Sequence, residues 1–169
     1  MAAARVRPLR PADRAPLREA LAACPEFSAH EVDVAVELID AELARTADYV
    51  HLVAEVDEPG AGAARVAGYV CIAPIPLTDH AWNLYWICVH PRVQGHGVGR
   101  RLMASAEAHV RAARGALLVL ETSGRDDYAA TRGFYGACGW EAEARIRDFY
   151  RPGDDIVYYV RRLGDRAKE

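Results

Sequence analysis

A glycine-rich segment near the middle of the chain is the feature that most constrains its fold. An apolar run ends at Val89, Pro91 follows, and the sequence then reads Gln94-Gly-His-Gly-Val-Gly99 before an arginine-rich amphipathic segment. This order predicts a strand, a tight turn and a helix. Alternating glycines let a backbone take positive φ angles and approach a ligand closely. The unpaired N–H groups and positive dipole at a helix start bind phosphate without a charged side chain.

The segments around this turn predict a mixed α/β domain. Hydrophobic patterning predicts strands at 6–9, 49–56, 66–75, 82–89, 116–122, 140–150 and 156–163, and helices at 12–23, 28–45, 98–114 and 128–138. Strand 82–89, the helix after it and strand 116–122 form a β-α-β unit, whose two strands should be parallel. We therefore expect a mixed, mostly antiparallel sheet with one central parallel step and helices on both faces.

Several local signals refine this expectation. Ser28 and Glu31 match the Ser-x-x-Glu capping box at the start of a helix. Gly115 is expected at the left-handed position that ends the 98–114 helix. The continuous apolar run 116–120 is typical of a strand covered on both faces. Residues 58–62 should form a turn between two antiparallel strands.

Length and charge narrow the class of protein. With 169 residues, a single domain is expected over 1–169, with a core at 5–163 and a polar tail at 164–169. The net charge of −3 predicts no overall basic surface, so no nucleic-acid partner is expected. The apolar runs are far shorter than the roughly 20 residues that span a bilayer, so no membrane association is expected. The N-terminal segment lacks the apolar core of an export signal, which favours the cytoplasm.

The cysteines favour isolated reduced thiols. Cys24, Cys71, Cys88 and Cys138 are widely spaced and none forms a C-x-x-C pair. Buried reduced cysteine behaves as a small hydrophobe. A disulfide framework or a zinc site would need closer spacing, so no metal site is expected.

Two common phosphate-binding loops do not match the glycine segment. The chain has no G-x-x-x-x-G-K-S/T sequence, and G-x-G-x-x-G fails from either Gly95 or Gly97. Instead, Gln94-x-x-Gly97-x-Gly99 resembles the Q/R-x-x-G-x-G/A motif of the GCN5-related N-acetyltransferase (GNAT) superfamily. The later sequence Gly133-Phe-Tyr-Gly-Ala-Cys-Gly-Trp140 resembles a second motif of that family. With the element order, the resemblance covers nearly the whole chain.

The resemblance implies a GNAT-like acyl-CoA acyltransferase fold that uses acetyl-CoA as co-substrate. In the family, backbone N–H groups of this loop hold the pyrophosphate of CoA, and the pantetheine arm pairs with the end of the preceding strand. An asparagine that contacts CoA is common where this chain has Tyr128. The cofactor-binding residues implied are Cys88, Val89, Gln94, Gly95, His96, Gly97, Val98, Gly99, Arg100 and Tyr128.

Direct attack of an amine on a thioester calls for a base, a donor to the oxyanion and an acid for the departing thiolate. The resemblance makes Tyr135 the candidate acid, since a tyrosine with an ordinary pKa is protonated at pH 7. Its alternative is an ordinary packed aromatic beside Phe134. The oxyanion donor implied by the resemblance is a strand N–H near Val89.

The base is less determined by the sequence. Glu121 ends strand 116–122, where partial shielding by apolar neighbours would raise the pKa of its carboxyl. It could equally cap the following loop. Asp79 and His80, on the loop before strand 82–89, are alternatives, although a solvated loop histidine is the more common arrangement.

The expected activity is acetyl-CoA-dependent N-acetylation of a primary amine, on a small molecule or a peptide N-terminus. The alternative is a non-catalytic acyl-CoA sensor or docking module of the same fold. An aminoacyl-tRNA-acetylating toxin also fits the fold, but the negative charge argues against it. Acceptor specificity should come from loops 24–28, 74–81 and 149–155. A homodimer is expected only by family analogy.

Overall fold

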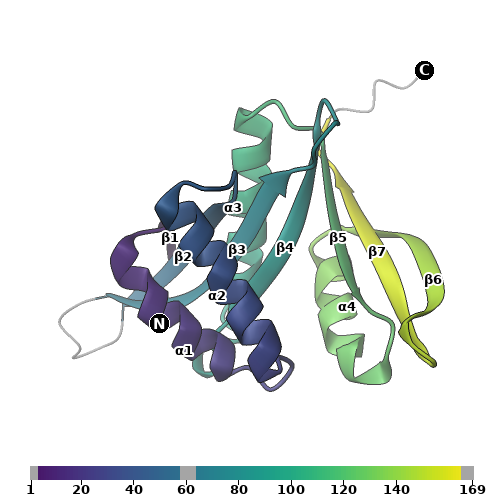
Figure 1. Ribbon diagram of the computed structural model, residues 1–169, viewed down its shortest axis with the longest axis horizontal. Helices are drawn as coiled ribbons and strands as arrows, with labels where there is room; N and C mark the ends of the chain where they lie inside the picture. The colour runs from purple at the N-terminus through teal and green to yellow at the C-terminus, as the bar shows by residue number, and fades with distance from the viewer. Residues whose placement is uncertain (1–3, 58–63, 165–169) are drawn as a thin grey trace. The chain divides into compact units, whose positions relative to one another are not determined.

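The computed structural model describes residues 4–57 and 64–164. Its elements alternate much as the hydrophobic pattern predicts (Figure 1). In chain order they are β1 (Arg5–Pro8), α1 (Arg14–Ala22), α2 (Ala29–Ala44), β2 (Val50–Asp57), β3 (Ala64–Pro74), β4 (Ala81–Val89), α3 (Val98–Ala112), β5 (Leu117–Ser123), α4 (Ala129–Ala137), β6 (Glu141–Arg151) and β7 (Asp154–Arg162). Short 3₁₀ turns cover Pro11–Asp13, Pro91–Val93 and Asp126–Tyr128.

The chain divides into two compact units. The first comprises Met1–Ala73 and Trp86–Ala108, and the second comprises Pro74–Tyr85 and His109–Glu169. Strand β4 contributes its C-terminal half to the first unit and its N-terminal half to the second. In order of hydrogen-bonded neighbours the strands run β1-β2-β3-β4-β5-β7-β6.

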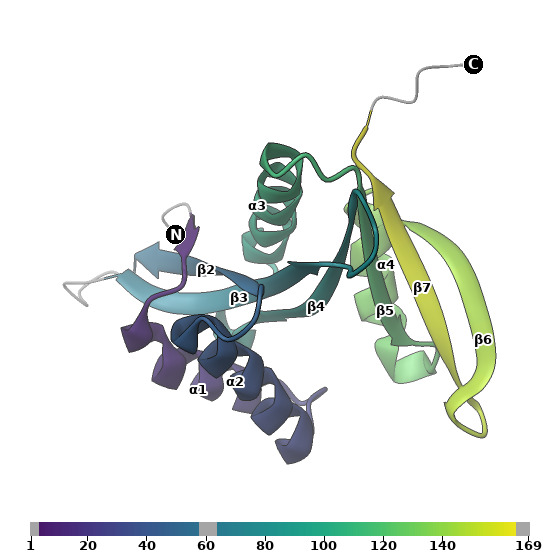
Figure 2. The same cartoon turned by 45° about the horizontal axis from the view of Figure 1, so that its top comes forward.

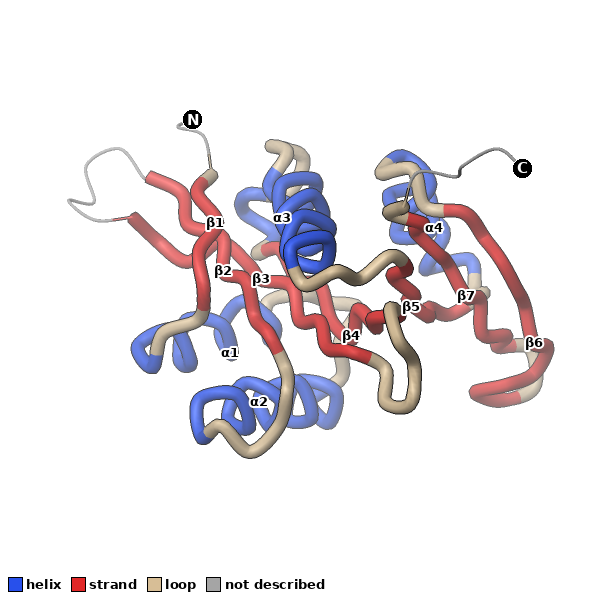
Figure 3. Tube along the Cα trace, turned by 90° about the horizontal axis from the view of Figure 1, so that it is seen from above, coloured by secondary structure: helices blue, strands red, loops and turns tan. Residues whose placement is uncertain are grey.

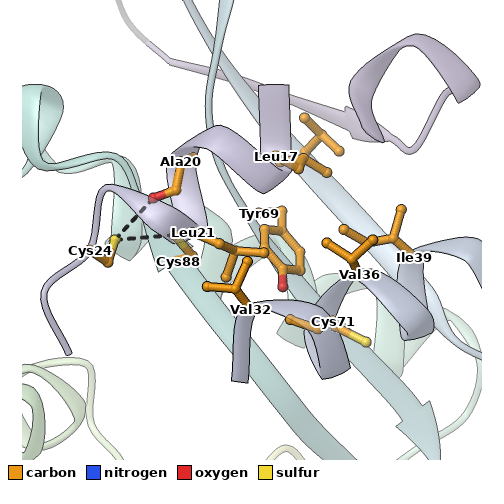
Figure 4. Packing of buried hydrophobic residues seen from close by; sticks show 12 residues of the cluster. Leu17, Ala20, Leu21, Cys24, Val32, Val36, Ile39, Tyr69, Cys71 and Cys88 are labelled. Atoms are coloured by element: carbon orange, nitrogen blue, oxygen red, sulfur yellow. Dashed lines mark hydrogen bonds between the residues drawn. The ribbon is translucent and has the colours of Figure 1, made fainter. Parts of the chain in front are cut away.

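The first unit is an antiparallel sheet covered by helices on both faces. β1 pairs with β2, and β2 pairs with β3 in a ladder that begins at Val50–Ile72 and ends at Asp57–Ala64. Helices α1 and α2 lie side by side on one face, and α3 lies on the other (Figures 2 and 3). The helix pair buries an apolar stripe against Tyr69 of β3 (Figure 4). The expected helices on both faces are therefore confirmed.

The start of α2 follows the predicted capping box. Ser28 Oγ accepts a hydrogen bond from the Glu31 N–H at 3.3 Å. In return, Glu31 Oε2 accepts one from the Ser28 N–H at 2.7 Å. These two bonds satisfy N–H groups that a helix start otherwise leaves without partners.

The second unit contains the parallel step. β4 and β5 pair in parallel from Ala81–Leu117 to Asn83–Val119. β5 and β7 then pair antiparallel, and β6 pairs antiparallel with the far side of β7. Helix α4 lies on one face of these strands (Figure 3). Tyr135 of α4 packs there against Tyr159 of β7. A mixed, mostly antiparallel sheet with one parallel step is therefore confirmed.

The end of α3 differs from the expectation. Arg114, not Gly115, takes the left-handed conformation, with φ of 61°. The Gly115 N–H donates to the Val110 carbonyl at 2.8 Å, and the Arg114 N–H donates to the Arg111 carbonyl at 3.0 Å. This pattern is a Schellman motif, in which Arg114 is the left-handed C′ residue and Gly115 is the following C″ residue. We had predicted Gly115 at C′. A glycine is needed there because a Cβ would lie 2.4 Å from Val110 Cγ1.

Strand β5 also differs from the expectation. Leu118, Leu120 and Thr122 are buried, whereas Leu117 and Val119 are half-buried and Glu121 is exposed. The strand therefore has one fully buried face, not two. The predicted turn at 58–62 lies outside the described residues, as does the tail beyond Gly164. In the described part of the chain, no helix is both long enough and apolar enough to cross a membrane.

Candidate functional site

The residues predicted for the site fall into two sets, one in each unit. Those at the end of β4 and in the glycine segment belong to the first unit. Glu121, Tyr128 and Tyr135 belong to the second. Each set has a local geometry that can be compared with the prediction.

The glycine segment forms the predicted strand-turn-helix connection. Gly95 and Gly97 take φ angles of 77° and 81°, which residues other than glycine rarely adopt. Gly99, however, lies in the first turn of α3, so only two of the three glycines use positive φ. The first bond of this helix runs from the Arg101 N–H to the Gly97 carbonyl at 3.1 Å. The N–H groups before Arg101 precede the helical ladder, as an anion site at a helix start requires.

The side chain of Gln94 links the glycine turn to the end of β4. Its Nε2 donates to the Val89 carbonyl at 3.0 Å, and its backbone N–H donates to the Pro91 carbonyl at 3.4 Å. His96 Nδ1 lies 2.8 Å from the Gln94 carbonyl, so Nδ1 carries the proton of that bond. The N–H of Gln94 is thus used inside the turn.

The strand end preceding the loop packs unusually closely against β3. A Cβ on Gly68 would lie 2.2 Å from the Cys88 carbonyl oxygen and 2.9 Å from Val89 Cα. The β2–β3 register shifts beside Gly68, and the Ala67 carbonyl accepts a hydrogen bond from the His90 N–H at 2.8 Å. We did not predict a role for Gly68 from the sequence. Its signal was a glycine inside a strand, which often marks a bulge or a close backbone approach.

Tyr135 is both packed and chemically suited to donate a proton. It is 6% exposed, and its ring lies 5.7 Å from Phe134, 6.5 Å from Trp140 and 5.6 Å from Tyr159. Burial is the main reason that the pKa of Tyr135 is raised well above its ordinary value. The phenol therefore keeps its proton at neutral pH and can act as a donor.

Glu121 lies on the exposed side of β5. Its cross-strand partner on β7 is Tyr158. The pKa of Tyr150 is raised to about 12, mainly by burial and secondly by the negative charge of Glu121. The loop after β5 is held by Ser123, which donates to Asp154 Oδ1 at 2.5 Å and accepts from the Arg125 N–H at 3.2 Å. Ser123, and not Glu121, therefore caps that loop.

The other candidates have simpler surroundings. Tyr128 precedes α4, with the Arg125 guanidinium 6.0 Å from its ring centre. Asp79 and His80 are both exposed on the loop before β4. Within residues 4–57 and 64–164, no group of three or more histidine, cysteine, aspartate or glutamate side chains is placed to hold a metal ion.

Three of the four cysteines are buried. Cys24, Cys71 and Cys88 are 4%, 0% and 3% exposed, while Cys138, which directly follows α4, is half-buried. All four are reduced. The expectation of buried thiols is therefore confirmed for three of them.

Comparison with known proteins agrees with the motifs. The family model of the GNAT acetyltransferase domain matches residues 47–142. A GNAT-family protein from Desulfovibrio desulfuricans, assigned as an acetyltransferase, is 38% identical, with a TM-score of 0.89, 96% of this chain covered and 100% of the other. No sequence among functionally curated proteins matches.

Two more distant structures share the fold. The ribosomal-protein-S18-alanine N-acetyltransferase of Escherichia coli has a TM-score of 0.72 at 16% identity, with 99% of this chain and 98% of that one covered. A Salmonella typhimurium protein solved with acetyl-CoA has a TM-score of 0.70 at 19% identity, with 98% and 97% covered. The family model and the Desulfovibrio relative together show that this chain belongs to the GNAT acetyltransferase family.

Proposed function

We propose that this protein transfers an acetyl group from acetyl-CoA to a primary amine by direct attack. The observation that carries the proposal is the loop after β4, in which Gly95 and Gly97 take positive φ and α3 begins at Val98. A turn of glycines leading into a helix start gathers N–H groups around one point, which suits a diphosphate. The family to which the chain belongs supports acetyl-CoA as the source of that diphosphate.

The cofactor-binding roles follow from this assignment. The pyrophosphate of CoA would be held by backbone N–H groups of Gly95, His96, Gly97, Val98, Gly99 and Arg100. The pantetheine arm would pair with the backbone of Cys88 and Val89, with a strand N–H near Val89 as the oxyanion donor. Gln94 would position the loop through its side-chain bond to Val89. Tyr128 would replace the asparagine that commonly contacts CoA.

The chemistry needs two proton transfers. The amine nitrogen attacks the thioester carbonyl, a C–N bond forms, and the C–S bond of acetyl-CoA breaks. Glu121 would take the proton released by the amine, and Tyr135 would donate its proton to the departing CoA thiolate. Because the amine attacks directly, no protein nucleophile takes part. Tyr135 is protonated at neutral pH, so its proton is present when the thiolate forms.

The proposal also concerns the kind of amine that accepts the acetyl group. Relatives of the same fold are named for aminoglycoside and for ribosomal-protein alanine acetylation, so the fold accommodates small amines and peptide N-termini. We propose an amine of one of these two kinds, bound through loops 24–28 and 74–81 and through residues 149–155, which form the end of the β6–β7 hairpin and not a loop. A homodimer and a cytoplasmic location stay predictions.

An amine panel tests the activity. The purified protein would be incubated with acetyl-CoA and with aminoglycosides, polyamines and short peptides that begin with alanine. Released CoA would be quantified by chromatography, because the cysteines of the protein interfere with thiol dyes. We expect CoA release above the amine-free control for at least one class. Tight acetyl-CoA binding in calorimetry without any release would instead support the sensor alternative.

A further inference from the structure

Two cysteines distant in the sequence meet inside the first unit. Cys24 lies two residues after the end of α1, and Cys88 lies one residue before the end of β4. Their Sγ atoms are 3.4 Å apart, and the residues are only 4% and 3% exposed (Figure 4). Nothing in the proposed acetyl transfer uses either thiol.

The hydrogen bonds around the pair make the two thiols unequal. Cys24 Sγ lies 3.3 Å from the Ala20 carbonyl and 3.6 Å from the Val89 carbonyl. Either thiol can donate in the contact between the two sulfurs, but only Cys24 has carbonyl acceptors beside it. Both protons are used when Cys24 donates to a carbonyl and Cys88 donates to the Cys24 sulfur. This bond from Cys88 lowers the pKa of Cys24, whereas the same bond, together with burial, raises the pKa of Cys88. Cys24 is therefore the thiol that ionises first and attacks.

We propose that Cys24 and Cys88 are a modification site at which a reversible Cys24–Cys88 disulfide forms. The oxidant is a low-molecular-weight disulfide. The Cys24 thiolate attacks one sulfur of the oxidant, a mixed disulfide forms, and the first small thiolate leaves. The Cys88 thiolate then attacks the Cys24 sulfur, and the second small thiolate leaves. Two protein thiols lose two protons and two electrons, and the oxidant is reduced to two small thiols.

Access and geometry are compatible with this exchange. Cys24 lies in the connection between α1 and α2, next to Pro25, which cannot continue a helix. Opening of a connection is a local event that leaves the packed helices in place. The sulfurs then need to close from 3.4 Å to the roughly 2.05 Å of a disulfide. Cys71 is more deeply buried, and burial raises the pKa of its thiol.

The bond would affect the site proposed above, so this consequence rests on the proposed function. The Val89 carbonyl accepts from Gln94 Nε2 at 3.0 Å and lies 3.6 Å from Cys24 Sγ. Oxidation removes the Cys24 S–H and ties the α1–α2 connection, a predicted acceptor loop, to the strand beside the phosphate loop. We expect turnover to fall several-fold and dithiothreitol to restore it.

Peptide mapping tests the bond itself, without any need for activity. A Cys138→Ser variant, which removes the half-buried thiol, would be incubated with oxidised glutathione and digested with trypsin and Asp-N. Cleavage before Asp79 separates Cys71, on residues 66–78, from Cys88, on residues 79–92, and Cys24 lies on residues 19–32. We expect a disulfide-linked pair of peptides 19–32 and 79–92. A bond through Cys71, a glutathione adduct that never resolves, or unchanged thiols would each overturn the proposal.

Variants separate the bond from its consequence. In the Cys138→Ser background, Cys24→Ser should make turnover insensitive to oxidised glutathione relative to its own reduced state, while Cys71→Ser should keep the sensitivity. If the linked peptides form and turnover does not change, the regulatory consequence is wrong. If the reduced protein acetylates no amine, the proposed function fails, whereas the linked peptides would still establish the modification site.

Discussion

Gly68 and the Cys88 carbonyl oxygen are so close that a Cβ on the glycine would lie 2.2 Å from that oxygen. Real Cβ atoms do not approach backbone oxygen at that distance, so any side chain at Gly68 must displace the end of β4. The displaced segment includes Val89, whose carbonyl accepts the hydrogen bond from Gln94 Nε2 that holds the glycine turn. One glycine on β3 therefore sets the position of a loop more than 20 residues later in the chain.

Gly68→Ala should lower both stability and cofactor affinity. We expect a loss of about 1–3 kcal/mol in the free energy of unfolding, as is typical for overpacking, and weaker acetyl-CoA binding. Urea unfolding and calorimetry measure the two effects. Gly133→Ala on α4 is the matched control for stability, because nothing lies within 4 Å of a Cβ there and alanine favours a helix. A Gly68→Ala protein as stable as the wild type would contradict the close approach.

Gly97 tests the backbone conformation of the phosphate loop. Its Cβ position is open, so the obstacle to a side chain is the φ of 81° and not a clash. Left-handed backbone costs roughly 1–2 kcal/mol for an ordinary residue and less for asparagine. We expect acetyl-CoA affinity to fall most for Gly97→Val and least for Gly97→Asn, as measured by titration calorimetry. Equal losses for both would show that side-chain size, and not φ, is limiting.

Tyr135→Phe removes the proposed acid without changing the ring. We expect kcat to fall on the order of 100-fold, a typical contribution from general-acid catalysis, with unchanged acetyl-CoA affinity. Because the pKa of Tyr135 is raised, the wild-type rate should show no loss from tyrosine ionisation below pH 10. Tyr159→Phe, which removes a hydroxyl from the ring packed 5.6 Å away, is the control. An unchanged kcat in Tyr135→Phe would leave the residue with a packing role only.

Glu121→Gln tests the proposed base through the pH dependence of the rate. A base is needed only while the amine is protonated, so the defect should be largest near neutral pH and shrink as pH approaches the pKa of the acceptor amine. Rates across this pH range, measured on the best acceptor of the panel, give the answer. A pH-independent defect would point to acceptor binding. Asp79→Asn and His80→Asn in the same assay test the alternative bases.

Asp13 and Arg7 form a buried ion pair in the first unit. It is 3% exposed, and the Arg7 guanidinium donates to its two carboxylate oxygens at 2.7 and 2.8 Å. Burial alone would raise the pKa of Asp13, but the hydrogen bonds from Arg7 and from the Arg10 N–H more than offset this and lower it. A lowered carboxyl pKa stabilises the fold above about pH 4, and this contribution disappears as pH falls through the native pKa.

Asp13→Asn should therefore lose stability at neutral pH and lose progressively less below pH 4. Breaking a buried pair typically costs about 3–5 kcal/mol, measured here by urea unfolding at several pH values. Asp40→Asn is the matched control, because Asp40 pairs with Arg14 at 2.6 and 2.7 Å but both side chains are nearly half exposed. Such exposed pairs contribute little, roughly 0–1 kcal/mol. Similar losses in the two variants would argue against a special contribution from burial.

Local sequence signals determined most of the secondary structure and the position of the phosphate loop. The Ser28–Glu31 box, the glycine turn before α3 and the period of the apolar residues each depend on neighbours a few positions away. For the same reason the two GNAT motifs were readable without a structure. The left-handed residue after α3 was misplaced by one position, because packing against Val110, and not helix termination, required the glycine at position 115.

The tertiary structure alone decided the contacts between distant residues. Cys24 and Cys88 are 64 positions apart, and nothing in either local sequence indicates that their sulfurs meet. The same holds for the contact between Gly68 and Cys88. These relationships depend on how strands and helices pack, and packing is set by the summed burial of many side chains and not by any short segment. The sequence by itself thus located the glycine turn between β4 and α3, while the fold determined which residues hold that turn in position.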